Sequence, residues 1–104
     1  MPHSVVEYDD VDPVGGGRHF LHDALGCSTL GVSVLDVEAG WSGEAHDHAA
    51  DGQEVYALVE GEATVTVGDE TVSMSAGDAL RVDPTATRRI DADADSLFVV
   101  AGAA

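Results

Sequence analysis

Short segments of alternating hydrophobic and polar residues, separated by glycine-rich turns, fill most of this chain. The clearest is Glu62–Val67, in which small or branched hydrophobic residues alternate with threonines. Such alternation places the hydrophobic side chains on one face, as in an antiparallel strand with one face buried. The dipeptide that follows, Gly68-Asp69, is typical of a tight hairpin turn. The chain is therefore predicted to be all-β.

The same pattern recurs often enough to indicate two packed or closed sheets. Short strands joined by turns are typical of a β-sandwich or barrel, and 104 residues suffice for one such domain. We predict an N-terminal arm or edge segment over residues 1–28 and a barrel over 29–104. Residues 19–25 form either a helical turn or an irregular strand. Further strands are predicted at 29–38, 54–60, 71–75, 79–82, 87–91 and 96–101.

The charge balance excludes several classes of partner. The chain has 20 acidic residues against four arginines and no lysine, so its formal net charge is −16. Disordered acidic chains are poor in hydrophobic residues, whereas this one is 44% hydrophobic, which indicates a folded domain with an acidic surface. Nucleic acids and anionic membranes are bound through clustered lysine and arginine, so neither is an expected partner.

The absence of lysine resembles the composition of proteins from salt-accumulating extreme halophiles. In molar salt the Debye length falls to about 3 Å, so acidic side chains repel one another less, and we expect the melting temperature to rise with KCl. Cys27 is the single cysteine, which excludes an intrachain disulfide and fits a reducing compartment. No segment resembles a signal peptide or a membrane span, so the cytoplasm is the expected location.

A cluster of metal-ligand residues lies in the middle of the chain. His46 and His48 are two residues apart, which in an extended segment places both side chains on the same face. Glu54 begins the next predicted strand and supplies a carboxylate. Two imidazoles and one carboxylate suit divalent zinc, manganese, iron or nickel.

The spacing around these residues resembles the first motif of the cupin superfamily, whose members are double-stranded β-helix barrels. That motif reads Gly, five residues, His-x-His, three or four residues, Glu, six residues, Gly. Here the corresponding residues are Gly40, His46, His48, Glu54 and Gly61, with five residues between His48 and Glu54. The resemblance covers roughly residues 29–101 and implies that His46, His48 and Glu54 are metal ligands.

The second cupin motif has diverged. It reads Gly, five residues, Pro-x-Gly, two residues, His, three residues, Asn, and aligning it on Gly77 places Arg88 where the family has its histidine. A register based on Pro84 would place Arg89 there instead. Alternation favours Arg88, because Arg88 shares a face with the hydrophobic Ile90, whereas Arg89 falls on the opposite, outward face and pairs with Asp91. The family's fourth metal ligand is therefore missing.

Arginine at this position leaves two interpretations, because a guanidinium is always protonated and has no lone pair with which to coordinate a cation. In the first, His46, His48 and Glu54 still hold a divalent metal, and Arg88 binds an anionic group of a substrate, with Tyr56 lining the pocket. In the second, Arg88 pairs with Glu54 and the barrel is a metal-free ligand site. Further metal donors in the first interpretation are His3, His19 and His22.

Three functions follow from these interpretations. The first is a metal-dependent oxygenase or isomerase of a small acidic or polar metabolite. The second is a metal-free module that binds or senses a small ligand, with Arg88 in place of the fourth metal ligand. The third is a metal-free sugar isomerase or epimerase, for which Tyr56 and the paired histidines would supply the acid and the base. The resemblance also implies a homodimer formed through edge strands.

Overall fold

The protein is described by a computed structural model that covers residues 2–47 and 52–103, so His48 lies outside the described residues. Within these two ranges no helix is both long enough and apolar enough to cross a membrane. The elements are, in chain order, the 3-10 helix η1 (Tyr8–Asp10), β1 (Arg18–Phe20), α1 (His22–Leu25), β2 (Leu30–Val37), β3 (Glu54–Glu60), β4 (Glu62–Val67), β5 (Glu70–Ser75), β6 (Ala79–Val82), β7 (Arg88–Ala92) and β8 (Ser96–Ala103).

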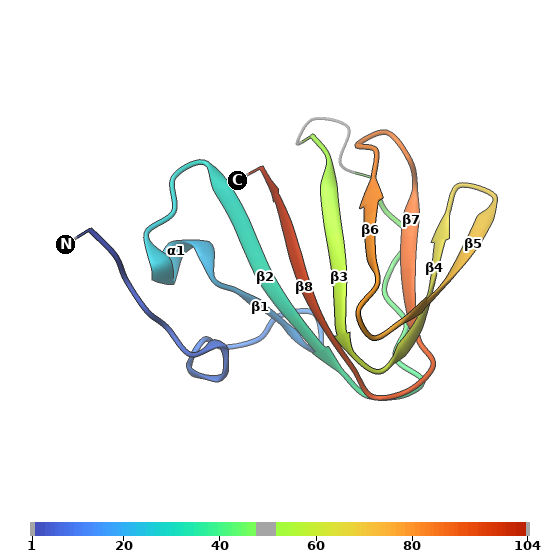
Figure 1. The fold of residues 1–104 in the computed structure, drawn as a ribbon, viewed down its shortest axis with the longest axis horizontal. Coiled ribbons are helices and arrows are strands. Elements are labelled where there is room, and N and C mark those ends of the chain that lie inside the picture. Colours follow the sequence, from blue (N-terminus) through green and yellow to red (C-terminus); the bar gives the residue numbers. More distant parts are fainter. Residues whose placement is uncertain (1, 48–51, 104) are drawn as a thin grey trace.

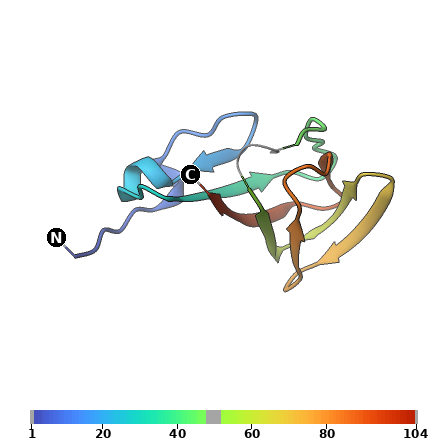
Figure 2. The ribbon, with the colours of Figure 1, turned by 90° about the horizontal axis from the view of Figure 1, so that it is seen from above.

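The strands form two antiparallel sheets that pack face to face (Figure 1, Figure 2). One sheet has five strands in the order β1-β2-β8-β3-β6, and the other has three strands in the order β5-β4-β7. In Figure 1 the five-stranded sheet occupies the left and centre of the molecule and the three-stranded sheet the right. This arrangement confirms the all-β, double-stranded β-helix barrel expected from the sequence.

The predicted strands agree closely with the observed ones. Strands β3, β4 and β6 begin and end at the residues expected from alternation, and the other four differ by one or two residues at an end. The undecided segment 19–25 contains both elements, the short strand β1 followed by the single helical turn α1. Strand β1 pairs with β2 and forms an edge of the five-stranded sheet.

The core lies between the two sheets and is made of inward-facing residues from both. Phe98 and Leu58 from the five-stranded sheet and Val65 from the three-stranded sheet are at most 1% exposed. Arg88 is the largest residue among the fully buried side chains, so the core also contains a charge. The remaining core residues are Leu35, Val37, Tyr56, Ala63, Met74, Val82, Ile90, Ala92 and Val100.

The segment that leads to His46, the first histidine of the His-x-His motif, runs along β7 and extends the three-stranded sheet. The amide of Gly40 donates to the carbonyl oxygen of Ala92 at 2.8 Å. At the other end of β7, His46 and Arg88 form an isolated antiparallel bridge, with N–O distances of 3.0 and 2.7 Å in the two directions. Main-chain hydrogen bonds therefore place the first-motif segment beside the second.

Candidate functional site

Arg88 points into the barrel, as the alternation of β7 predicts. It is 1% exposed and shares the inner face of β7 with the buried Ile90. Arg89 is exposed, and its Nε donates to Oδ2 of Asp91 at 3.2 Å. Of the two alignments of the second motif, the one that places Arg88 at the family's fourth-ligand position therefore puts an inward-pointing side chain there.

The buried guanidinium of Arg88 is held by two oxygen atoms. Its Nη1 lies 3.5 Å from Oε1 of Glu54, whose side chain is 17% exposed, and its Nη2 donates to the carbonyl oxygen of Asp83 at 2.5 Å. The Nε atom is buried and has no hydrogen-bond partner among the described residues. Because an isolated buried charge is costly, Glu54 stabilises Arg88 in the core.

Tyr56 completes this corner of the barrel. Its hydroxyl donates to the same Oε1 of Glu54 at 2.9 Å, and its side chain is fully buried. Burial raises the pKa of Tyr56 well above its usual range, and the charge and the hydrogen bond of Glu54 raise it further. Tyr56 is therefore a protonated hydrogen-bond donor at neutral pH.

This raised pKa predicts a loss of stability in alkali. The folded state holds the Tyr56 proton more tightly than the unfolded state, whose tyrosine pKa is about 10, so stability is complete below about pH 10 and falls above it. The chain has no lysine, whose side chain would titrate in the same pH range. Denaturant unfolding measured between about pH 9 and 12 should show the fall, and Tyr56→Phe should make it shallower.

The matched control uses Tyr8, which is only partly buried and whose pKa is raised mainly by its hydrogen bond to Asp36. Phenolate absorbance should report Tyr8 while the barrel is still folded, and Tyr56 only as the barrel unfolds. A Tyr56 phenolate that forms reversibly in the folded protein would show that the Tyr56–Glu54 contact is weaker than the structure indicates.

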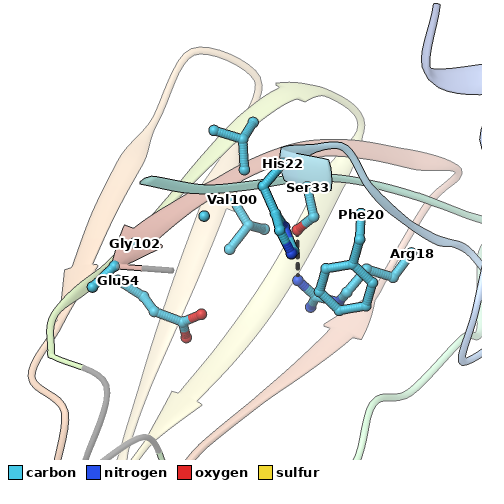
Figure 3. A pocket seen from close by; sticks show the side chains of 10 residues that line it. Arg18, Phe20, His22, Ser33, Glu54, Val100 and Gly102 are labelled. Atoms are coloured by element: carbon cyan, nitrogen blue, oxygen red, sulfur yellow. Dashed lines mark hydrogen bonds between the residues drawn. The ribbon is translucent and has the colours of Figure 1, made fainter. Parts of the chain in front are cut away.

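A pocket of about 180 Å³ opens beside Glu54, between β3 and the strands β1 and β2. Figure 3 shows Arg18, Phe20 and His22 on one side and Glu54 on the other, with Val100 between them. The Nη1 of Arg18 donates to Oγ of Ser33 at 2.9 Å, and the Arg18 guanidinium carbon lies 5.8 Å from the centre of the Phe20 ring. Gly31, Val32, Gly102 and Ala103 complete the lining.

Arg18 differs from the other three arginines in its surroundings. Arg81, Arg88 and Arg89 each lie within 4 Å of a carboxylate oxygen. Arg18 forms no such ion pair with any residue of 2–47 or 52–103, although the chain contains 20 acidic residues. Arg18 is half-buried and lines both this pocket and a second hollow, which is also lined by His46 and Trp41.

The four histidines in the described part of the chain have different surroundings. His46 is exposed, its Nδ1 lies 2.9 Å from the carbonyl oxygen of Glu44, and its neighbour His48 lies outside the described ranges. His19 is buried on the opposite side of β1, with its Nδ1 2.6 Å from the carbonyl oxygen of Val11. His3 is exposed in the N-terminal arm. His22 lines the pocket, and its Nδ1 is buried with no partner in the described part of the chain.

Among the described residues, the corner around Glu54 holds the guanidinium of Arg88. A metal held by Glu54 at about 2.0–2.2 Å would lie within a few ångströms of the Arg88 cation, which would repel it. Residues 2–47 and 52–103 contain no group of three histidine, cysteine or acidic side chains placed to hold a metal. The pairing of Arg88 with Glu54 is the one that the second interpretation expected, whereas the metal site of the first interpretation includes His48, which lies outside the described residues.

Comparison with known proteins identifies the family. A family model described as a cupin domain matches residues 33–101, which is more than half of the chain. The chain belongs to the cupin family. Both sequence motifs lie within the matched residues, including the bridge between His46 and Arg88. A comparison with curated proteins found no match.

Three solved structures resemble this cupin over nearly its whole length. A cupin protein from Bacteroides fragilis is 28% identical, with 95% of this chain and 84% of that chain covered and a TM-score of 0.72. An RmlC-like cupin from Shewanella frigidimarina is 22% identical, with 99% and 94% covered and a TM-score of 0.76. KdgF from a Halomonas species is 19% identical, with 96% and 92% covered and a TM-score of 0.75.

Proposed function

We propose that this cupin binds a small organic monocarboxylate in the pocket between Arg18 and Glu54, without a metal ion. The observation that carries the proposal is the half-buried Arg18, which faces the pocket and forms no ion pair in the described ranges of a chain with 20 acidic residues. A planar guanidinium in a partly desolvated pocket is the group that best recognises a carboxylate, because it donates two parallel hydrogen bonds.

The rest of the pocket sets the size and polarity of the ligand. Its volume of about 180 Å³ is below the range of roughly 300–1,000 Å³ that is typical of drug-sized ligands, which indicates a small metabolite. Phe20 and Val100 provide hydrophobic surface for its carbon atoms. On the wall opposite Arg18, the Glu54 carboxylate is an acceptor for a hydroxyl group of the ligand, and its charge is offset by Arg88.

The position of Tyr56 does not favour the metal-free isomerase or epimerase. That function needs a tyrosine that can exchange a proton with substrate near neutral pH. The Tyr56 hydroxyl is buried and bonded to Glu54, and its pKa is raised, so its proton is held in the fold. Tyr56 therefore acts as a positioning residue for Glu54 in this proposal.

The binding test compares small carboxylates with their neutral amides. Isothermal titration in KCl would use acetate, lactate and benzoate, with acetamide, lactamide and benzamide as the uncharged counterparts. At least one acid should bind more tightly than its amide, and Arg18→Gln should weaken that binding about tenfold or more, since a hydrogen bond to a charged group contributes roughly 1.5–3 kcal/mol. Arg81→Gln, which changes an exposed arginine outside the pocket, should leave the affinity unchanged.

Equal affinity for acids and amides, or an unaffected Arg18→Gln variant, would contradict the proposed role of Arg18. The variants themselves are expected to fold, because the Arg18 side chain is only half-buried and Arg81 is exposed.

The metal-dependent oxygenase or isomerase is the second candidate function. It is favoured by the His46-x-His48 spacing and by the family, and it would use His46, His48 and Glu54 as ligands. Metal content measured by mass spectrometry separates the candidates. Under the metal-free proposal, wild-type protein exposed to Fe, Mn, Ni or Zn and then dialysed stays substoichiometric, and Arg88→His gains metal. Stoichiometric metal in the wild type that His46→Ala removes would establish the metal-dependent candidate instead.

A further inference from the structure

We propose that the acid bound by Arg18 carries a flat aromatic ring, which lies in the second hollow against Trp41. The inference rests on the proposed function, because it keeps Arg18 as the carboxylate-binding group, and it names the class of acid. Arg18 lines both the pocket and the second hollow, and Trp41, the one tryptophan of the chain, lines the second hollow. An acid with its carboxylate on Arg18 and its hydroxyl group toward Glu54 can extend its side chain past Arg18 into this hollow.

The second hollow lies between one edge of each sheet. On one side are Gly15 and Arg18, at the beginning of β1, which is an edge strand of the five-stranded sheet. On the other side are Trp41 and His46, in the segment that runs along β7. The volume of the hollow is about 520 Å³, compared with about 180 Å³ for the pocket beside Glu54. The hollow therefore offers room for a ring in addition to the small acid that the pocket holds.

Two glycines fix the position of the Trp41 ring on the wall of the hollow. Trp41 is half-buried and packs against the core. A methyl group on Gly43 would come within 3.0 Å of Cη2 at one end of the indole, and a methyl group on Gly16 within 3.3 Å of Nε1 at the other. Because main chain approaches the indole closely at both ends, its position is set before a ligand arrives. A preorganised aromatic wall favours the stacking of a flat ring.

The charges around the hollow decide which end of the acid enters it. Arg18 attracts a carboxylate, whereas Glu44, an exposed residue of the opposite wall, repels one. The hydroxyl group of Ser42 donates its hydrogen to Oδ1 of Asp91 at 2.5 Å, so this hydrogen is not offered to a ligand. The part of the ligand that enters the second hollow is therefore uncharged and hydrophobic. A phenyl ring meets both conditions, and a second carboxylate meets neither.

Isothermal titration in KCl with three related hydroxy acids tests the inference. Phenyllactate, which is lactate with a phenyl ring on its methyl group, should bind about tenfold or more tightly than lactate, because the ring loses hydrophobic surface to water. Cyclohexyllactate has a ring of similar size without a π face, so it should gain less than phenyllactate. The fluorescence of Trp41, which has no other tryptophan to obscure it, should change with phenyllactate and stay constant with lactate.

Two substitutions in the second hollow should affect the ring and spare the rest of the acid. Trp41→Leu keeps a hydrophobic side chain but removes the stacking surface, so it should weaken phenyllactate binding several-fold and leave lactate binding unchanged. Gly43→Ala keeps the indole but places a methyl group 3.0 Å from its Cη2, and it should have the same selective effect. Phe20→Leu is the matched control, since Phe20 lines the pocket and its loss should weaken both acids alike.

The outcomes separate this inference from the proposed function. If lactate binds through Arg18 but phenyllactate binds no more tightly, or leaves the fluorescence of Trp41 unchanged, the inference is overturned and the proposed function stands. Equal weakening of both acids by Trp41→Leu, in protein that keeps its strands by circular dichroism, would lead to the same conclusion. Equal affinity for phenyllactate and its neutral amide would instead contradict the role of Arg18, and with it both proposals.

Discussion

Replacing Arg88 with methionine is expected to lower the free energy of unfolding by about 3 kcal/mol, because removing one partner of a buried ion pair leaves the other uncompensated. Arg88 is 1% exposed and lies between Glu54 and the carbonyl oxygen of Asp83. Methionine fills much of the same volume, so the loss reports the charge and the hydrogen bonds more than a cavity. Urea denaturation monitored by circular dichroism measures it.

Arg89→Met is the matched control for this prediction. Arg89 is the next residue on the same strand, but it is exposed and its ion pair with Asp91 is at the surface, so the change should cost less than about 1 kcal/mol. A second comparison uses Glu54→Gln, alone and with Arg88→Met. The double variant should be more stable than the sum of the two single losses predicts, because no charge is left unpaired in it. Strict additivity would contradict the ion pair.

Gly61→Ala is expected to destabilise the fold by about 3 kcal/mol or more. Gly61 lies between β3 and β4, where the chain passes from one sheet to the other, and its φ is +99°. An L-residue in this region is strained by roughly 1–3 kcal/mol. A methyl group at Gly61 would also overlap the carbonyl oxygen of Asp95 and come within 2.5 Å of Oγ of Ser96. Because that carbonyl belongs to the main chain, the turn itself must shift.

A substitution at Gly77 separates the two causes of destabilisation, which are backbone strain and steric overlap. Its φ is +100°, but an added methyl group would have no atom within 4 Å. Gly77→Ala should therefore show the backbone strain alone, at roughly 1–2 kcal/mol, whereas Gly61→Ala shows strain and overlap together. The measurement is the difference between the two free energies of unfolding. If both variants lost the same stability, the close approach of Asp95 to Gly61 would not be rigid.

The strands were predictable because the signals for them lie in short, continuous stretches of the sequence. In β4 and β7 every second residue is hydrophobic or buried, and glycine marks the turns between them, so strand limits follow from the chain itself. The same alternation correctly placed Arg88 inside the barrel and Arg89 outside, even though an arginine in a core is unusual. The undecided segment before β2 is short, and a three-residue strand has too few positions for alternation to be recognised.

The place of Arg18 in the pocket was not predictable, because it depends on contacts between distant parts of the sequence. Its inward orientation depends on pairing with Leu35 of β2, a contact between residues far apart in sequence. The only local signal is that Arg18 and Phe20 are two residues apart and so share a face if the segment is extended. The ion pair between Arg88 and Glu54 was foreseen as part of one of two interpretations, and the 3.5 Å between their side chains confirms the pair itself.

The bridge between His46 and Arg88 has an evolutionary consequence. It is made by main-chain atoms alone, so the backbone at position 88 is held in place whichever side chain it carries. Histidine and arginine codons are interconverted by a single-base change. A barrel of this kind is therefore able to exchange an imidazole for a guanidinium at position 88 in one mutational event without rebuilding its scaffold, and so to replace a potential metal ligand with a buried cation that pairs with Glu54.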